Sequence, residues 1–209
     1  MGITERKSRE KEELRQEILN AARELFLREG YQNVSMRRIA EKIEYSPTTI
    51  YLYFRDKADL LNQICDETFI GLLKRLESIE RRDLPPLEKL KRVLRAYVEF
   101  GLEHPHQYTL VFMTPQPEEE CPCEQGEKCF NFLVQAVQAC VDRGEVPEGN
   151  VPVMARLLWS GLHGLTSLLI TFPDFEWGDQ AELIRSLPET LVAGLKALGT
   201  KGTKKKKRG

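Results

Sequence analysis

Apolar residues recur at three- and four-residue steps along most of the chain, and the strict alternation of a half-buried strand is nearly absent. The clearest stripe runs from Arg9 to Glu29, and Gly30 follows it at the position of a helix C-terminal cap. Proline interrupts the pattern elsewhere, as at His104-Pro105. We therefore expect an all-α fold of about nine helices, over residues 9–29, 36–43, 47–53, 57–76, 87–103, 106–113, 128–143, 152–172 and 179–198.

Two of the expected helices are short and are joined by a tight link, between residues 34 and 60. Ser35 and Ser46 each precede one of them, where a serine hydroxyl can accept a hydrogen bond from an orphan backbone amide. Pro47 follows at the first helical position, which suits a proline. Packed on the longer first helix, the pair would form a helix-turn-helix, whose second helix reads the major groove of DNA.

The second short helix has an outer face without charge, made of Pro47, Thr48, Thr49, Tyr51 and Tyr53. Hydroxyl and methyl groups of this kind suit base edges and thymine methyls. Cations flank the face, because Arg37 and Arg38 begin the preceding helix and Lys57 begins the next, where free amides favour a phosphate. Two alternatives stay open: the tyrosine rings can belong to the core, and Lys57 can be a solvated surface lysine.

Together, Gly30-Tyr31, the run from Ser35 to Ala40 and the run from Tyr45 to Leu60 closely resemble the DNA-binding domain of the TetR/AcrR family of transcriptional regulators. The resemblance implies a repressor that binds a palindromic DNA operator as a dimer and is released by a small, mostly apolar effector. Many relatives have glycine in place of Thr48, which leaves the base contact of that residue open. Taken together, the residues and the resemblance give these expected DNA contacts: Ser35, Arg37, Arg38, Ser46, Pro47, Thr48, Thr49, Tyr51, Tyr53 and Lys57.

We expect three parts: the helix-turn-helix domain over residues 1–60, a helical ligand-binding and dimerisation domain over 61–199, and a basic tail over 200–209. The last two helices are apolar over more than one face, which is typical of deep core or of an interface. Paired with a second copy, they would form a four-helix bundle. Its expected interface residues are Leu158, Leu162, Leu165, Leu169, Leu187, Leu191 and Leu195. A purely intramolecular core is the alternative.

A second resemblance concerns Trp159, His163 and Gly164, whose Trp-x-x-x-His-Gly pattern is similar to the C-terminal domain called WHG in some TetR relatives. Trp159 and His163 lie one helical turn apart and share a face. Aromatic residues here and on neighbouring helices are candidate walls of an effector pocket suited to a mostly apolar molecule. They are Phe69, Tyr97, Phe100, Tyr108, Phe112, Phe130, Phe132, Trp159 and His163, with plain core packing as the alternative for each.

Three cysteines, Cys121, Cys123 and Cys129, suggest an alternative function as a metal- or redox-responsive repressor. Their spacing is not that of a structural zinc site, so we expect no bound metal and no cofactor. Cys65 and Cys140 fit small core positions. An odd total of five cysteines in a chain of this length favours the reducing cytoplasm.

A formal net charge of −1 means that any DNA-binding surface must come from a local arrangement of cations. The most apolar segment, residues 157–172, is too short to span a bilayer, and the N-terminus lacks a signal peptide, so no membrane partner is expected. No phosphate-binding loop, Glu-x-x-His pair or activated nucleophile indicates an enzyme. The expected partners are double-stranded DNA, a small-molecule effector and a second copy of the chain.

Overall fold

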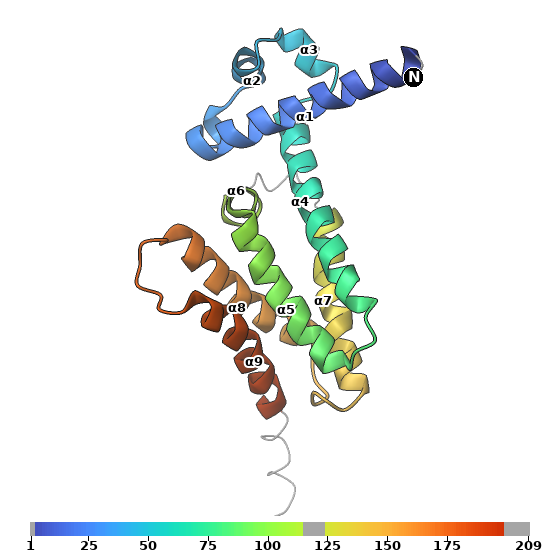
Figure 1. Cartoon of the computed structure of the whole chain (residues 1–209), viewed down its shortest axis with the longest axis vertical. Helices are drawn as coiled ribbons and strands as arrows, with labels where there is room; N and C mark the ends of the chain where they lie inside the picture. The colour runs from blue at the N-terminus through green and yellow to red at the C-terminus, as the bar shows by residue number, and fades with distance from the viewer. Residues whose placement is uncertain (1–2, 115–123, 199–209) are drawn as a thin grey trace, which may run out of the picture. The chain divides into compact units, whose positions relative to one another are not determined.

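The computed structural model of the chain describes residues 3–114 and 124–198, which fall into two compact units. The first unit takes Met1–Thr68 and a later segment, His106–Glu124, and the second takes Phe69–Pro105 and the chain from Gln125 on. Within the described residues all regular structure is helical, as expected, with nine α-helices and two short helices of other pitch (Figure 1).

The first unit forms around α1 and the two short helices. Its elements are α1 (Ile3–Glu29), the 3-10 helix η1 (Tyr31–Asn33), α2 (Met36–Lys42), α3 (Pro47–Tyr51), the start of α4 (Lys57–Glu80), and later α6 (Pro105–Tyr108) and the π-helical η2 (Thr109–Met113). Leu25, Ile39, Ile50 and Ile64 are fully buried in one shared core. Leu110 of η2 is fully buried in the same core, which is why the later segment belongs to this unit.

The unit boundary lies further along α4 than the predicted domain boundary at residue 60. Leu61, Ile64 and Cys65 pack into the first unit's core, so this unit extends through Thr68. Periodicity could not reveal the boundary, because the apolar stripe of α4 continues without a break across it.

The second unit contains the rest of α4 with α5 (Pro86–Glu103), α7 (Glu124–Asp142), α8 (Val151–Thr171) and α9 (Gln180–Leu198). Helix α5 packs against both α8 and α9, which also pack against each other. Leu94 and Val98 of α5 are fully buried, as are Ala155 of α8 and, nearly so, Val192 of α9. Part of the core of this unit therefore lies between these three helices.

Several helices differ from their predicted lengths. Helix α1 begins six residues before Arg9, where the ion pair between Arg6 and Glu10 supports a polar helical start. Helix α7 begins at Glu124, inside a predicted loop, and α3 ends at Tyr51 rather than near residue 53. The predicted helix over residues 106–113 is instead a short α-helix followed by π-helical turns.

Helix α8 corrects the expectation that its apolar segment is too short to cross a membrane. Asn150 caps the helix by accepting a hydrogen bond from the amide of Val153 at 3.2 Å, so the helix begins six residues before Leu157 and runs for 21 residues. With a mean hydropathy of 1.3, it is long and apolar enough to span a bilayer by length and composition alone. One stripe of it packs in the core described above, as core helices of the same composition do.

Candidate DNA-binding and effector sites

Local hydrogen bonds fix both short helices of the first unit. Ser46 Oγ accepts the backbone amide of Thr49 at 3.2 Å and lies 2.9 Å from that residue's Oγ1. Ser35 Oγ accepts the amide of Arg38 at 3.2 Å in the same way. Both caps that the sequence predicts are therefore confirmed, and Pro47 occupies the first turn of α3 as expected.

Helix α3 displays its uncharged face outward. Ile50 is fully buried against α2, whereas Pro47 and Thr48 are exposed and Tyr51 is 54% exposed. Thr49 is half-buried. The outward orientation of this face agrees with the sequence analysis, and its contact with DNA remains a prediction.

Tyr53 lies elsewhere: it is half-buried and packs against the unit's apolar core. Sequence reasoning missed two exposed neighbours of α3, since Leu52 is 75% exposed and the side chain of Arg55 is largely exposed too. The signal was present in the sequence. Ile50 and Phe54 share one buried side, which leaves residues 52 and 55 on the other.

The cations before α3 are exposed and only loosely paired. Arg37 Nε lies 3.1 Å from Glu41, and Arg38 Nη2 lies 3.2 Å from Glu29. Hydrogen bonds from Arg28 and Arg38 hold the pKa of Glu29 below its usual range, so this carboxylate is charged at neutral pH. Exposed ion pairs of this kind contribute little to stability, so a phosphate can replace the carboxylate.

Lys57 has a different environment. Its Nζ donates to the backbone oxygen of Tyr31 at 2.7 Å and lies 4.2 Å from the centre of the Tyr31 ring. The Lys57 ammonium is thus engaged by η1 within the chain, an arrangement that the sequence did not suggest.

A polar cluster joins α1 to α4 inside the first unit. Glu67 accepts hydrogen bonds from Arg15 and Gln16, each at 3.3 Å, and from Arg23. Arg15 also donates to Gln63 at 2.7 Å. Because these side chains come from both helices, the cluster fixes α1 against the start of α4.

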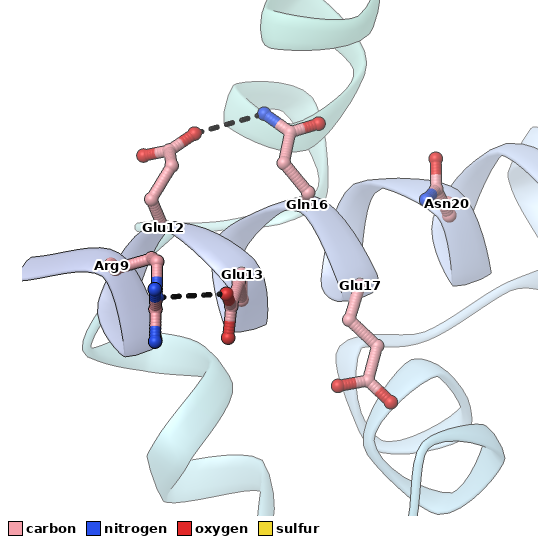
Figure 2. A pocket seen from close by; sticks show the side chains of 6 residues that line it. All are labelled: Arg9, Glu12, Glu13, Gln16, Glu17 and Asn20. Carbon is pink, nitrogen blue, oxygen red and sulfur yellow. Dashed lines mark hydrogen bonds and ion pairs between the residues drawn. The ribbon is translucent and has the colours of Figure 1, made fainter. Parts of the chain in front are cut away.

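A hollow on the first unit opens along a single helix, α1. Figure 2 shows that residues lining it pair with one another: Arg9 forms an ion pair with Glu13, and Gln16 donates a hydrogen bond to Glu12 at 3.0 Å. Six residues with polar or charged side chains line it: Arg9, Glu12, Glu13, Gln16, Glu17 and Asn20. Because one helix alone lines it, the hollow does not enclose a small molecule as an effector pocket does.

The predicted pocket residues divide between the two units. Tyr108 and Phe112 belong to the first unit, where their ring centres lie 4.7 Å apart and Tyr108 is almost fully buried. The second unit holds Phe69, Tyr97, Phe100, Phe130, Phe132, Trp159 and His163. Phe69 and Phe100 are buried in it, whereas Phe132 is half-buried.

Trp159 is the centre of an aromatic cluster in the second unit. Its Nε1 donates to Tyr97 Oη at 3.0 Å, and its ring lies 6.2 Å from Phe130 and 6.3 Å from His163. The prediction that Trp159 and His163 share a face of one helix is confirmed. Burial lowers the pKa of His163, so the imidazole is neutral at pH 7.

The cysteines in the described residues are buried. Cys129 Sγ donates to the backbone oxygen of Phe69 at 3.5 Å, whereas Cys121 and Cys123 lie outside the described residues. Within the part of the chain that the structure describes, no three metal-ligating side chains come together. Cys65 and Cys140 lie in cores, as expected, and burial together with Glu145 raises the pKa of Cys140 to about 11.

The predicted dimer interface requires a correction. Leu158, Leu162, Leu169 and Leu195 are at least 95% buried within the chain itself, so they have no surface left to offer a second copy. Leu165, Leu187 and Leu191 are only half-buried. Because α8 is apolar on two sides, its periodicity did not reveal which stripe faces inward.

The exposed stripe of α8 lies on the other side and carries Val153, Leu157, Leu168 and, just beyond the helix, Phe172. Gly164 lies between them. A Cβ added at Gly164 would meet no atom within 4 Å beyond its own helical surroundings. An open apolar surface therefore runs along α8 in the single chain.

Comparison with known proteins identifies the family. Residues 18–64 match the model of bacterial regulatory proteins of the tetR family, and residues 90–193 match the tetracyclin repressor-like C-terminal domain. The chain belongs to the TetR family. It is a DNA-binding transcriptional regulator and not an enzyme. The WHG resemblance of its C-terminal part remains a prediction.

Individual relatives cover nearly the whole length of this TetR-family protein. It is 25% identical over 184 residues to the fatty acid metabolism regulator protein of Bacillus subtilis, covering 86% of this chain and 94% of the relative. The fold resembles that of FadR from Bacillus subtilis in complex with stearoyl-CoA, with a TM-score of 0.73 and 23% identity over 86% of this chain and 98% of that one. FadR from Bacillus halodurans gives a TM-score of 0.74 at 20% identity, over 87% and 96% of the two chains.

Proposed function

We propose that this TetR-family protein is a cytoplasmic, homodimeric repressor that leaves its operator when a long-chain acyl-CoA thioester binds the second unit. The observation that carries the proposal is the outward, uncharged face of α3. Thr48 and Tyr51 offer groups for base edges, and Arg37 and Arg38 lie beside them as phosphate contacts. Ser35, Ser46, Pro47 and Thr49 complete the proposed surface.

The exposed stripe of α8 supports the homodimer. A helix-turn-helix protein reads two half-sites one helical turn apart, which calls for a two-fold partner. Glycine inside a helix costs about 1 kcal/mol relative to alanine. Nothing within 4 Å explains Gly164 of α8 or Gly194 of α9 in the single chain, whereas close approach of a second backbone does. A second copy also covers Leu157 and Leu168.

The effector class is supported by the relative that was solved with stearoyl-CoA and by the aromatic cluster around Trp159. Tyr97, Phe130 and Trp159 supply the apolar surface that an acyl chain prefers, and Tyr97 Oη and the indole nitrogen supply polar groups.

The experiment uses the full-length chain and duplexes that it enriches from a random-sequence pool. We expect an enriched palindrome, protection of both half-sites in footprinting, and release on addition of stearoyl-CoA but not of coenzyme A or stearate alone. Thr48→Ala replaces an exposed side chain, so the variant should stay folded while its enrichment of the palindrome weakens. Release by zinc or oxidant that is lost in Cys123→Ser would instead favour the cysteine-based alternative. Failure to enrich any duplex would refute the proposal.

A further inference from the structure

The N-terminus of α4 is already occupied by carboxylates. Helix amides in this position commonly receive a DNA phosphate. Here Asp56 Oδ1 accepts the amide of Asp59 at 2.8 Å, and Asp59 Oδ2 accepts the amide of Arg55 at 3.0 Å. The amide of Asp59 and the guanidinium of Arg55 hold the pKa of Asp56 below its usual range. A phosphate approaching this terminus would therefore meet negative charge.

Lys57 lies between these two carboxylates in the chain, and its side chain turns toward η1. Its Nζ donates to the backbone oxygen of Tyr31 at 2.7 Å and lies 3.5 Å from that of Gln32. The ammonium also lies 4.2 Å from the centre of the Tyr31 ring, within the range of a cation–π interaction. Hydrogen bonds from a charged donor are among the stronger ones in proteins.

Tyr31 is itself firmly held. It is 95% buried, and its ring centre lies 5.3 Å from that of Phe26 near the end of α1. The contact of Lys57 with Tyr31 therefore ties the end of α1, through η1, to the start of α4. Helices α2 and α3 are the chain between these two points, so the contact closes the loop that carries the reading helix.

We propose that Lys57 is a positioning residue for DNA binding rather than a phosphate contact: it clamps η1 to α4 and thereby holds α2 and α3 in the orientation that reads DNA. The role rests on the DNA binding of this family and is independent of the proposed effector and of its release. Lys57 then adds nothing to the number of phosphates that the protein neutralises.

Salt dependence separates the two roles. Each phosphate contact contributes about 0.9 to the slope of log affinity against log salt concentration. We expect full-length Lys57→Met to bind the duplex enriched by the wild type about tenfold more weakly, since α2 and α3 must then be ordered at the expense of binding free energy. The slope should equal that of the wild type. A slope shallower by about 0.9 would overturn the proposal.

A double-mutant cycle provides a second test. Tyr31→Leu removes the ring but leaves the hydrogen bond of Lys57 to the backbone oxygen, so it should cost a smaller factor in affinity than Lys57→Met. In the double variant the losses should not multiply, because Lys57→Met already removes the ammonium that contacts the Tyr31 ring. Affinity losses that multiply would overturn the proposal. A loss of affinity in Lys42→Met as large as that in Lys57→Met would overturn it too. Lys42 is the matched control, a lysine of α2 whose Nζ lies 2.8 Å from a carboxylate oxygen of Glu24 in α1.

Folding is followed alongside by thermal melting, monitored by circular dichroism. A slope does not depend on the folded fraction, so partial unfolding of a variant does not hide the result. If the wild type enriches no duplex, DNA binding itself is refuted, and the role of Lys57 falls with it. If it enriches one and the slope changes, only the role of Lys57 is refuted.

Discussion

Leu157 and Leu158 are neighbours on α8, one exposed and the other buried, so replacing each with alanine separates the core from the outer surface. Leu158 is 1% exposed and Leu157 is 53% exposed. Leu158→Ala leaves a cavity in the core and should lower the free energy of unfolding by about 2–5 kcal/mol. Leu157→Ala should change the stability of a single chain by no more than about 0.5 kcal/mol.

For dimerisation, we expect the larger effect from Leu157→Ala. Complete burial of a leucine side chain stabilises by about 1.5–3 kcal/mol, and roughly half of Leu157 is still open to a partner. Each copy then contributes about 0.8–1.5 kcal/mol, and a two-fold interface counts it twice. Leu157→Ala should therefore raise the dimer dissociation constant about 15- to 150-fold.

Sedimentation equilibrium measures the dissociation constant, and urea denaturation at two protein concentrations measures stability, because dimer-linked stability depends on concentration. We expect Leu157→Ala to dissociate more readily, with its core intact. Leu158→Ala should unfold at lower urea at both concentrations. A Leu157→Ala protein that dimerises like the wild type would refute the assignment of this stripe.

Three further outcomes follow from contacts described above. Ser46→Ala should lower the free energy of unfolding in urea by about 1 kcal/mol and weaken operator binding in gel-shift assays. Ser46→Asp should retain the cap, and equal effects of the two substitutions would contradict it. The pKa of His163 is lowered by burial, so its contribution to stability is present above the ordinary value of 6.5 and declines as pH falls. His163→Gln should flatten urea stability between about pH 7 and 5, and an unchanged profile would count against this reading. With a pKa near 11, Cys140 should react with iodoacetamide at neutral pH only after unfolding, as peptide mass mapping can check; rapid labelling of the native protein would contradict its burial.

The reading helix was predictable because its signals are local. Ser46 and Pro47 mark its start, and Ile50 marks its buried side, all within one turn of each other. The hydrogen bond of Lys57 was not predictable. Its acceptor is the backbone oxygen of Tyr31, which lies 26 residues earlier in the chain, and any residue type at that position would supply such an oxygen. Sequence patterns carry no information on such contacts.

The inward stripe of α8 illustrates a second limit. Leu157 and Leu158 are the same residue type at adjacent positions, and both lie on apolar stripes with helical spacing. Only the packing of α5 and α9 determines that Leu158 is buried. The division between the units was hidden for a related reason, because Ile64 and Phe69 continue one apolar pattern along α4 although they belong to different cores.

Because the outer face of α3 carries no charge, sequence preference and ionic attraction to DNA would come from different residues. In the proposed binding mode, Thr48 and Tyr51 distinguish sequences through contacts that mobile ions hardly screen, whereas the flanking arginines supply the ionic attraction shared by every duplex. A rise in cellular potassium would shorten the time spent on all sites alike. The rank order of its binding sites across a genome would stay the same as the cell's osmotic conditions change.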